Sequence, residues 1–121
     1  MTNLTLTPTT LNGTVIVPPS KSMAHRAVIC ASLAAGRSTI KNIQLSDDIL
    51  ATIEGMRSFG AIISYDDQTL TIDGIRNGAA QESRTINCNE SGSTLRFLIP
   101  LATLFTGETH FIGQGHLGKR P

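Results

Sequence analysis

The sequence predicts an α/β fold with mixed sheets, built from about one and a half copies of a repeated βαβαββ unit. Segments with helical and with strand periodicity alternate along the 121 residues, and glycines follow the helical segments. The chain also aligns with itself at an offset of 71 residues. The length suffices for one domain with one core, and the apolar content is ordinary for a globular protein.

The first part of the chain predicts short strands on either side of a helix. Strands are expected at 4–6, 14–17 and 38–43, and the helix at 24–35. Pro18-Pro19 breaks the chain before the helix, which Ser20 or Ser22 can cap. Gly36 is well placed to end it.

The middle of the chain predicts a second helix and a hairpin. Ser46 is the expected cap, and Asp47-Asp48 would lie in the positive first turn of a helix that Gly60 ends. The hairpin is expected to join strands at 61–65 and 69–73.

The last part predicts a polar loop, two strands and a third helix. The loop is expected at 74–84, the strands at 85–88 and 109–112, the helix at 94–105, and a glycine-rich loop from 113 to the last residue. Pro100 should kink this helix or delay its start, and Gly107 should stop it.

The offset of 71 residues relates strand, cap, helix, stop and following strand. The aligned pairs are identical or similar in character: Val15–Ile86, Val17–Cys88, Ser20–Ser91, Ser22–Ser93, Ala31–Ala102, Leu33–Leu104, Gly36–Gly107 and Ile40–Phe111. Several pairs involve common residues, so coincidence is the alternative. A true repeat whose second copy ends halfway predicts that the chain is a fragment, because such units stack to bury their apolar faces.

Composition and charge argue against several classes of function. The net charge is +1, with no Trp and one Tyr, which indicates neither a nucleic-acid surface nor a base-stacking platform. There is no secretion signal pattern and no apolar run of membrane-spanning length. We therefore expect a cytoplasmic protein that binds neither nucleic acid nor membrane.

The cysteines and histidines predict neither a disulfide nor a metal site. Cys30 and Cys88 lie outside any C-x-x-C motif, and both are expected in the core. The histidines, His25, His110 and His116, do not cluster along the chain. We expect no metal.

Ser20-Lys21-Ser22, followed by His25 and Arg26, is the first candidate site. It lies at a predicted helix N-terminus, where free N–H groups and the helix dipole favour an anion. Lys21 offers a point charge and Arg26 a bidentate fork, and Ser22 shares a helix face with Arg26. The alternative is a capped helix with solvated cations. No G-x-x-x-x-G-K pattern is present, so this is not a phosphate-binding loop of that type.

The segment 89–94, followed by Arg96, is the second candidate site. Gly92 permits close approach of a ligand to the backbone, and Ser93 lies beside it. Arg96 falls in the first helical turn, where its charge opposes the dipole and therefore needs an anionic partner. That partner is either a bound anion or Glu90.

The loop 113–121, with Lys119 and Arg120, is the third candidate, and a mobile basic loop is the alternative. If stacking of the units brings the three segments together, they form one cationic cleft for a small polyanion. Asp47 and Asp48 most simply serve their helix N-terminus.

These segments resemble the 5-enolpyruvylshikimate-3-phosphate synthase family, a branch of the enolpyruvyl transferases. The matching motifs run in order along the chain: Leu11-x-Gly13, Pro19-Ser20-Lys21-Ser22-x-x-x-Arg26, Ser46-Asp47-Asp48, Ser91-Gly92-Ser93-Thr94-Leu95-Arg96, and Gly113 to Leu117 with Arg120-Pro121. The resemblance covers about the first quarter to third of such an enzyme.

The resemblance implies a function and a set of roles. The family transfers the enolpyruvyl group of phosphoenolpyruvate to the 5-hydroxyl of shikimate 3-phosphate, in aromatic amino acid biosynthesis, without metal or cofactor. Lys21 would be catalytic and contact both substrates, with Ser22 and Arg26 on shikimate 3-phosphate and Gly92 and Arg120 on phosphoenolpyruvate. Arg96, Ser93 and Asp48 would support them.

The resemblance also implies a domain organisation. Residues 1–18 would belong to the second of two domains, and residues 19–121 to a partial N-terminal domain. Further substrate ligands and the groups that transfer protons would lie in the missing C-terminal part. We therefore expect the 121-residue chain alone to show no turnover.

Two alternatives remain beside this reading. One is a non-catalytic anion-binding fragment. The other is the sister family that transfers enolpyruvate to UDP-N-acetylglucosamine, which typically has Lys-Asn near its start and a reactive Cys in the third loop. Here the pair is Lys21-Ser22 and the loop position is Gly115. Glu90-Ser91-Gly92-Ser93 and Phe97 also depart from the commonest pattern of the shikimate branch.

Overall fold

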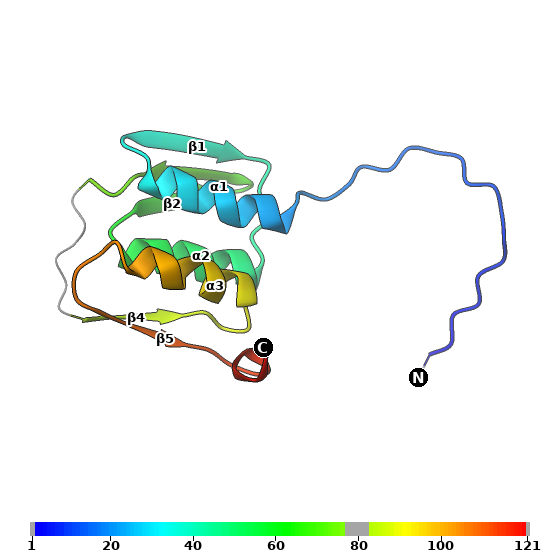
Figure 1. Cartoon of the computed structure of the whole chain (residues 1–121). Helices are drawn as coiled ribbons and strands as arrows, with labels where there is room; N and C mark the ends of the chain where they lie inside the picture. The colour runs from blue at the N-terminus through cyan, green and yellow to red at the C-terminus, as the bar shows by residue number, and fades with distance from the viewer. Residues whose placement is uncertain (1, 77–82, 121) are drawn as a thin grey trace.

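A computed structural model describes residues 2–76 and 83–120, and their elements alternate as a mixed α/β chain (Figure 1). In order, the elements are α1 (Lys21–Leu33), β1 (Arg37–Lys41), α2 (Asp47–Ser58), β2 (Ile62–Asp66), β3 (Thr69–Asp73), β4 (Ser83–Asn87), α3 (Gly92–Ala102), β5 (Glu108–Ile112) and the 3₁₀ helix η1 (Leu117–Lys119). The predicted α/β class with mixed sheets is confirmed. Part of the predicted loop 74–84, namely 77–82, and the terminal residues Met1 and Pro121 lie outside the described residues.

The predicted strands at 4–6 and 14–17 are wrong for this chain. Residues 2–20 contain neither helix nor strand, and the segment extends away from the body of the molecule (Figure 1). Its apolar side chains are 77–94% exposed: Leu4, Leu6, Leu11, Val15, Ile16 and Val17. A strand requires backbone partners, and none of the described strands pairs with this segment.

One sheet contains the predicted hairpin. Its strand order is β1-β3-β2, and both pairings are antiparallel. Asp67, at the hairpin turn, has a φ of 50°. Short polar side chains tolerate this left-handed conformation better than most, which explains how the turn forms without glycine.

The second sheet pairs β4 with β5 in parallel, and α3 makes the crossover between them. The α3 helix starts at Gly92 and ends at Ala102 rather than spanning 94–105, so a late start forced by Pro100 is wrong. The early start follows from Ser91, whose hydroxyl accepts a hydrogen bond from the Thr94 N–H at 3.1 Å. The η1 helix lies in what was predicted to be a glycine-rich loop.

The offset of 71 residues is preserved in three dimensions from helix cap to strand. Ser20 caps α1 and Ser91 caps α3, each accepting from the N–H three residues on. Gly36 and Gly107 both have left-handed φ values, 91° and 85°. The strands that follow, β1 and β5, begin and end 71 residues apart. The repeat therefore holds for helix, stop and strand.

The core lies between the sheets and the helices, with α2 at its centre. The fully buried side chains include Ile49, Ile53, Met56, Phe59, Leu70, Ile72, Ile86 and Leu98. Phe59 stacks on Phe105 with ring centroids 4.6 Å apart, and the buried Arg84 lies over both rings. Gly55 permits α2 to approach α3, since a Cβ there would lie 2.3 Å from Leu98 Cδ1. None of the helices in the described part is long and apolar enough to cross a membrane.

Candidate anion-binding site

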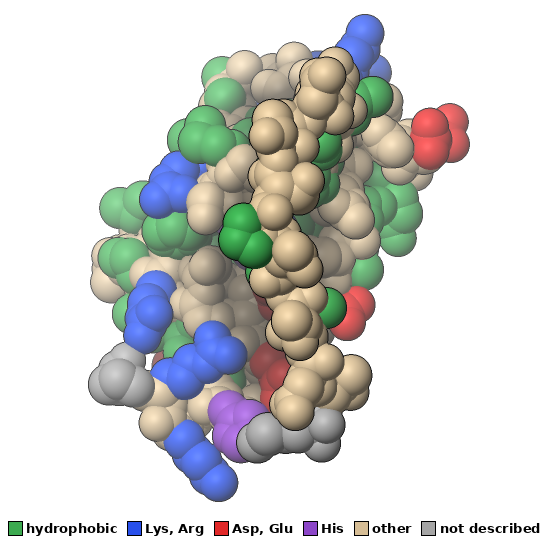
Figure 2. Space-filling model, turned by 90° about the vertical axis from the view of Figure 1, so that its right-hand side faces the viewer, with side chains coloured by type: hydrophobic (Ala, Val, Ile, Leu, Met, Phe, Trp, Pro, Cys, Tyr) green, Lys and Arg blue, Asp and Glu red, His purple; other side chains and the backbone are tan. Residues whose placement is uncertain are grey.

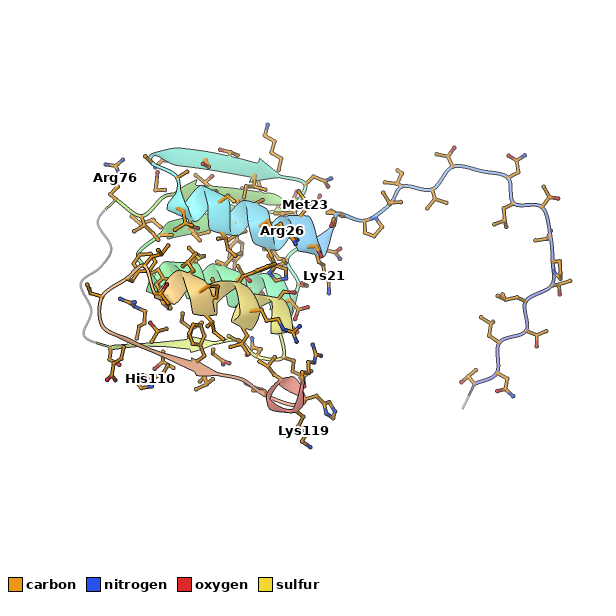
Figure 3. All side chains as sticks on the ribbon, in the orientation of Figure 1. Lys21, Met23, Arg26, Arg76, His110 and Lys119 are labelled. Atoms are coloured by element: carbon orange, nitrogen blue, oxygen red, sulfur yellow. The ribbon has the colours of Figure 1, made fainter. Side chains whose placement is uncertain are left out.

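The three sequence-predicted sites lie at one end of the molecule. The N-terminal ends of α1, α2 and α3 and the η1 helix share this end in Figure 1. Lys21, Arg26 and Lys119 lie there in Figure 3, whereas Arg76 and His110 lie at the opposite end. Figure 2 views the molecule from this end and shows most of the visible Lys and Arg side chains on one side of the extended N-terminal segment. Positive charge and free helix N–H groups therefore coincide.

The first turns of α1 carry three of the predicted ligands. Ser20 caps the helix, and Lys21, Ser22 and Arg26 are exposed on it. The Arg26 guanidinium donates to the Ser22 carbonyl oxygen at 2.9 Å and lies 5.2 Å from the ring centroid of Phe97 on α3. This contact across two helices restricts the guanidinium while leaving it accessible to an anion.

Asp48 contributes a carboxylate to the same end. Its Oδ2 lies 3.8 Å from Lys21 Nζ, a contact between the first turns of α1 and α2. Both side chains are partly solvated, so the pair is worth little in stability.

The second site is a pocket of about 180 Å³ at the N-terminus of α3, lined by Gly92, Leu95, Arg96, Leu117 and Arg120. A Cβ at Gly92 would lie 3.4 Å from Arg120 Nη1 and 3.9 Å from Arg96 Nη1. Two guanidinium groups therefore converge on the bare backbone of Gly92. Fork-shaped donors at a helix N-terminus suit a phosphate or carboxylate. Ser93 is exposed beside this pocket.

The third segment is anchored rather than free, which corrects the mobile-loop alternative for its described part. The Gln114 N–H donates to the Asn89 carbonyl oxygen at 2.7 Å, and Leu117 is buried. These contacts fold η1 against the entry to α3 and bring Arg120 to Gly92. Glu90 extends towards Gly115, where a Cβ would lie 1.4 Å from its Oε1.

The structure joins the first two sites through a buried polar chain that the sequence reasoning missed. His25 Nδ1 lies 2.7 Å from Thr52 Oγ1, which lies 2.8 Å from Thr94 Oγ1. Thr94 donates to Ser91 Oγ at 2.7 Å and reaches the Asp48 carbonyl oxygen at 3.2 Å. One signal in the sequence could have indicated this network: Thr52 is a polar residue among the apolar positions of α2, next to Ile53.

Burial shifts the pKa of two groups, one within this hydrogen-bond network and one in the core. Burial lowers the pKa of His25, Asp48 raises it, and Lys21 and Arg26 lower it again. His25 is therefore biased towards its neutral form. Burial also raises the pKa of the Cys88 thiol, which lies in the core as predicted.

Cys30 is exposed, so its prediction as a core residue is wrong. The buried face of α1 includes Ala24, Val28 and Ala31, which follow helical spacing, and Cys30 lies off that stripe. Among the described residues, no group of three His, Cys, Asp or Glu side chains is arranged to hold a metal ion.

Comparison with known proteins identifies the family. The sequence pattern of EPSP synthase (3-phosphoshikimate 1-carboxyvinyltransferase) matches residues 6–121. The chain belongs to the EPSP synthase family. The predicted resemblance is confirmed, and the motifs at Lys21, Gly92 and Arg120 all lie within the matched region.

Curated EPSP synthases resemble the chain along its whole length. The 3-phosphoshikimate 1-carboxyvinyltransferase of Clostridium beijerinckii is 55% identical over 100% of this chain and 29% of its own length. That of Clostridioides difficile is 54% identical over 100% of this chain and 30% of its own length. The chain thus spans less than a third of these relatives. Neither carries the description of the sister family, which is therefore not favoured.

A solved EPSP synthase shares the fold. The enzyme of Acinetobacter baumannii superposes with a TM-score of 0.75 at 25% identity, over 90% of this chain and 25% of that one. The fold of this chain therefore has a counterpart in a solved EPSP synthase.

Proposed function

We propose that this chain forms the anion-binding part of an EPSP synthase, which transfers the enolpyruvyl group of phosphoenolpyruvate to the 5-hydroxyl of shikimate 3-phosphate and releases phosphate. The observation that carries the proposal is the convergence of Arg96 and Arg120 on Gly92 at the end where α1 also begins. Two cationic sites at one end suit two anionic substrates that must react with each other.

In this proposal α1 holds shikimate 3-phosphate. The Ser22 hydroxyl and the Arg26 guanidinium donate hydrogen bonds to the carboxylate-bearing ring and the phosphate of shikimate 3-phosphate. The support is that Arg26 is exposed yet restrained by Phe97 and the Ser22 carbonyl. A restrained fork loses less conformational entropy when an anion binds.

The pocket at Gly92 takes phosphoenolpyruvate, with Arg120 on its charged groups, Arg96 and Ser93 in support, and Lys21 shared between the substrates. Fixed cations allow two anions to bind side by side, and this positioning makes the reaction effectively unimolecular. The same cations stabilise the charge that moves onto the departing phosphate. Protonation of the methylene carbon and removal of the hydroxyl proton fall to residues beyond this chain.

The proposal includes the domain organisation. Residues 19–121 form part of the first domain, and residues 1–18 pair with a second domain. The support is the exposure of Val15, Ile16 and Val17, a run of β-branched side chains that suits a strand covered on both faces by a partner outside the described residues. The chain alone should show no turnover. Its cysteines are free thiols, which supports the cytoplasmic location that we include in the proposal.

The test is an NMR titration of the ¹⁵N-labelled chain with shikimate 3-phosphate. We expect saturable shifts over Lys21–Arg26 that disappear in Arg26→Ala. The matched control is Arg37→Ala, because Arg37 is also exposed but pairs with Asp73 at 2.9 Å on β3. Binding that survives Arg26→Ala unchanged would contradict the assigned site. A turnover assay with both substrates completes the test, since phosphate release above background would contradict the expected inactivity.

A further inference from the structure

The buried hydrogen-bond network described above, made of one imidazole and three hydroxyl groups, links the two proposed substrate sites. Each of its four side chains is at most 3% exposed: His25, Thr52, Ser91 and Thr94. His25 lies on α1, Thr52 on α2 and Thr94 on α3, so the chain crosses all three helices whose N-termini form the site. Polar groups so deeply buried must satisfy one another, because water does not reach them.

The direction of the hydrogen bonds follows from the acceptors at one end. The Asp48 carbonyl oxygen can only accept, so the single proton of the Thr94 hydroxyl is shared between this oxygen, at 3.2 Å, and Ser91 Oγ, at 2.7 Å. With its proton directed there, Thr94 accepts from the Thr52 hydroxyl at 2.8 Å. Thr52 in turn accepts from His25 Nδ1–H at 2.7 Å. The arrangement assigns the Nδ1–H tautomer to His25.

Both ends of this hydrogen-bond network lie next to residues of the proposed substrate sites. At one end His25 lies one residue before Arg26 and one turn after Lys21. At the other end Ser91 precedes Gly92, and its hydroxyl caps the helix that presents Gly92. The backbone carbonyl oxygen of Asp48 accepts a hydrogen bond from the Thr94 hydroxyl. The carboxylate of Asp48 lies 3.8 Å from Lys21 Nζ.

We propose that Thr52 is a positioning residue that couples the two substrate sites. Its hydrogen bonds to His25 and Thr94 fix the position of the α1 N-terminus relative to the α3 N-terminus. This inference rests on the proposed function, because the coupling matters only if both sites bind anions. Thr52 touches neither site directly. It acts through the hydrogen bonds that it makes on both sides.

The coupling has a defined physical basis. When a buried hydroxyl that makes two hydrogen bonds is removed, each of its two partners loses one hydrogen bond. Each partner must then find a new donor or acceptor. Because interiors are close-packed, such groups recover partners through small helix shifts. Shifts of this size at a pair of binding sites change how one site responds to occupation of the other.

The first measurement uses the unsubstituted chain and needs no substrate. Long-range ¹H–¹⁵N spectra of the imidazole report which ring nitrogen carries the proton. We expect the Nδ1–H tautomer for His25, and its loss in Thr52→Val, which keeps the shape of the side chain but removes the hydroxyl. An Nε2–H tautomer in the unsubstituted chain would overturn the assigned relay, whether or not Thr52→Val folds.

The second measurement follows both sites during titration with shikimate 3-phosphate. In the unsubstituted chain, shifts at Ser22 should be accompanied by shifts at Gly92 and Ser93. In Thr52→Val we expect the Ser22 response to remain, the Gly92 and Ser93 response to be lost, and phosphoenolpyruvate binding in the presence of shikimate 3-phosphate to weaken about tenfold. Thr52→Ser, which restores the hydroxyl, should recover both.

The matched control is Ser32→Ala. Ser32 is equally buried, but its hydroxyl donates to Val28 O within α1 at 2.7 Å and links no second helix. It should leave the coupling unchanged. If Thr52→Val retains the Gly92 response and the phosphoenolpyruvate affinity, the positioning role is wrong and the proposed function stands. If the unsubstituted chain binds neither substrate, the proposed function fails and the positioning role fails with it.

Discussion

Arg120 Nη1 lies 3.4 Å from the position that a Cβ atom on Gly92 would occupy. The two residues come from different elements, since Gly92 is the first residue of α3 and Arg120 follows η1. Contact at this distance leaves no room for both a side chain at 92 and an anion beneath the guanidinium. The identity of residue 92 therefore controls access to the pocket.

Gly92→Ala should weaken phosphoenolpyruvate binding about tenfold, because the methyl group occupies the space that the anion would take. Shikimate 3-phosphate binding should be unchanged. Isothermal titration of each substrate separates the two effects. Gly118→Ala is the control, since a Cβ there meets nothing within 4 Å. Equal loss for both substrates would indicate that α3 itself had moved.

Phe97→Leu should weaken shikimate 3-phosphate binding by about two- to fivefold, the effect of losing one exposed cation–π contact with Arg26. Leucine preserves an apolar contact but provides no ring face. Tyr65→Leu is the matched control, because Tyr65 makes the same kind of contact with Arg57, 6.0 Å from its centroid, outside the site. An unchanged affinity in Phe97→Leu would show that the ring does not restrain Arg26.

His25 should make the folded state less stable as the pH falls. Its pKa in the folded chain is lowered, chiefly by burial and further by Lys21 and Arg26, although Asp48 opposes this. The unfolded chain therefore binds the proton more readily. The stability contributed by neutral His25 is complete above about pH 6.5 and declines as the pH falls towards the folded pKa.

Thermal unfolding between pH 8 and pH 5 measures this dependence. His25→Asn should flatten the His25 part of the curve, since asparagine does not titrate in this range. His110→Asn is the control, because His110 is exposed and lies at the other end of the molecule (Figure 3). The same pH dependence in His25→Asn and in the unsubstituted chain would refute the assignment.

Gly74→Ala should destabilise the fold by about 2 kcal/mol. A Cβ at Gly74 would lie 1.8 Å from the Ala34 carbonyl oxygen, which is backbone and cannot rotate away. The end of β3 would have to separate from the end of α1. Urea unfolding measures the change, with Gly118→Ala again as the control. A loss below about 0.5 kcal/mol, the range of neutral surface substitutions, would show that this backbone relaxes easily.

Local features were well predicted from the sequence because they depend on neighbouring residues. Ser20 and Ser91 cap their helices, and Gly36, Gly60 and Gly107 adopt positive φ values near the predicted stops. The hairpin strands lie at Ile62–Asp66 and Thr69–Asp73, within one residue of the predicted 61–65 and 69–73. These elements need only the hydrogen bonds and φ values available within a short segment.

Features that depend on distant partners were not well predicted. The segment 14–17 is rich in β-branched residues but has none of the described strands beside it, and so remains extended and exposed. Cys30 lies on a helix of predicted position, yet it is exposed because packing selects a different stripe. Arg84 falls at the end of the predicted polar loop 74–84, yet it is 5% exposed and its guanidinium lies over the rings of Phe59 and Phe105.

The sequence by itself determined the family, the helix entries and the identity of the cationic residues Lys21, Arg26, Arg96 and Arg120, because motifs and caps are local. Only the tertiary structure decided that Arg120 reaches Gly92, that Phe97 restrains Arg26, and that Thr52 joins His25 to Thr94. These contacts join segments far apart in the chain. Their geometry depends on how α1 and α3 pack against α2, and packing is a property of the whole core.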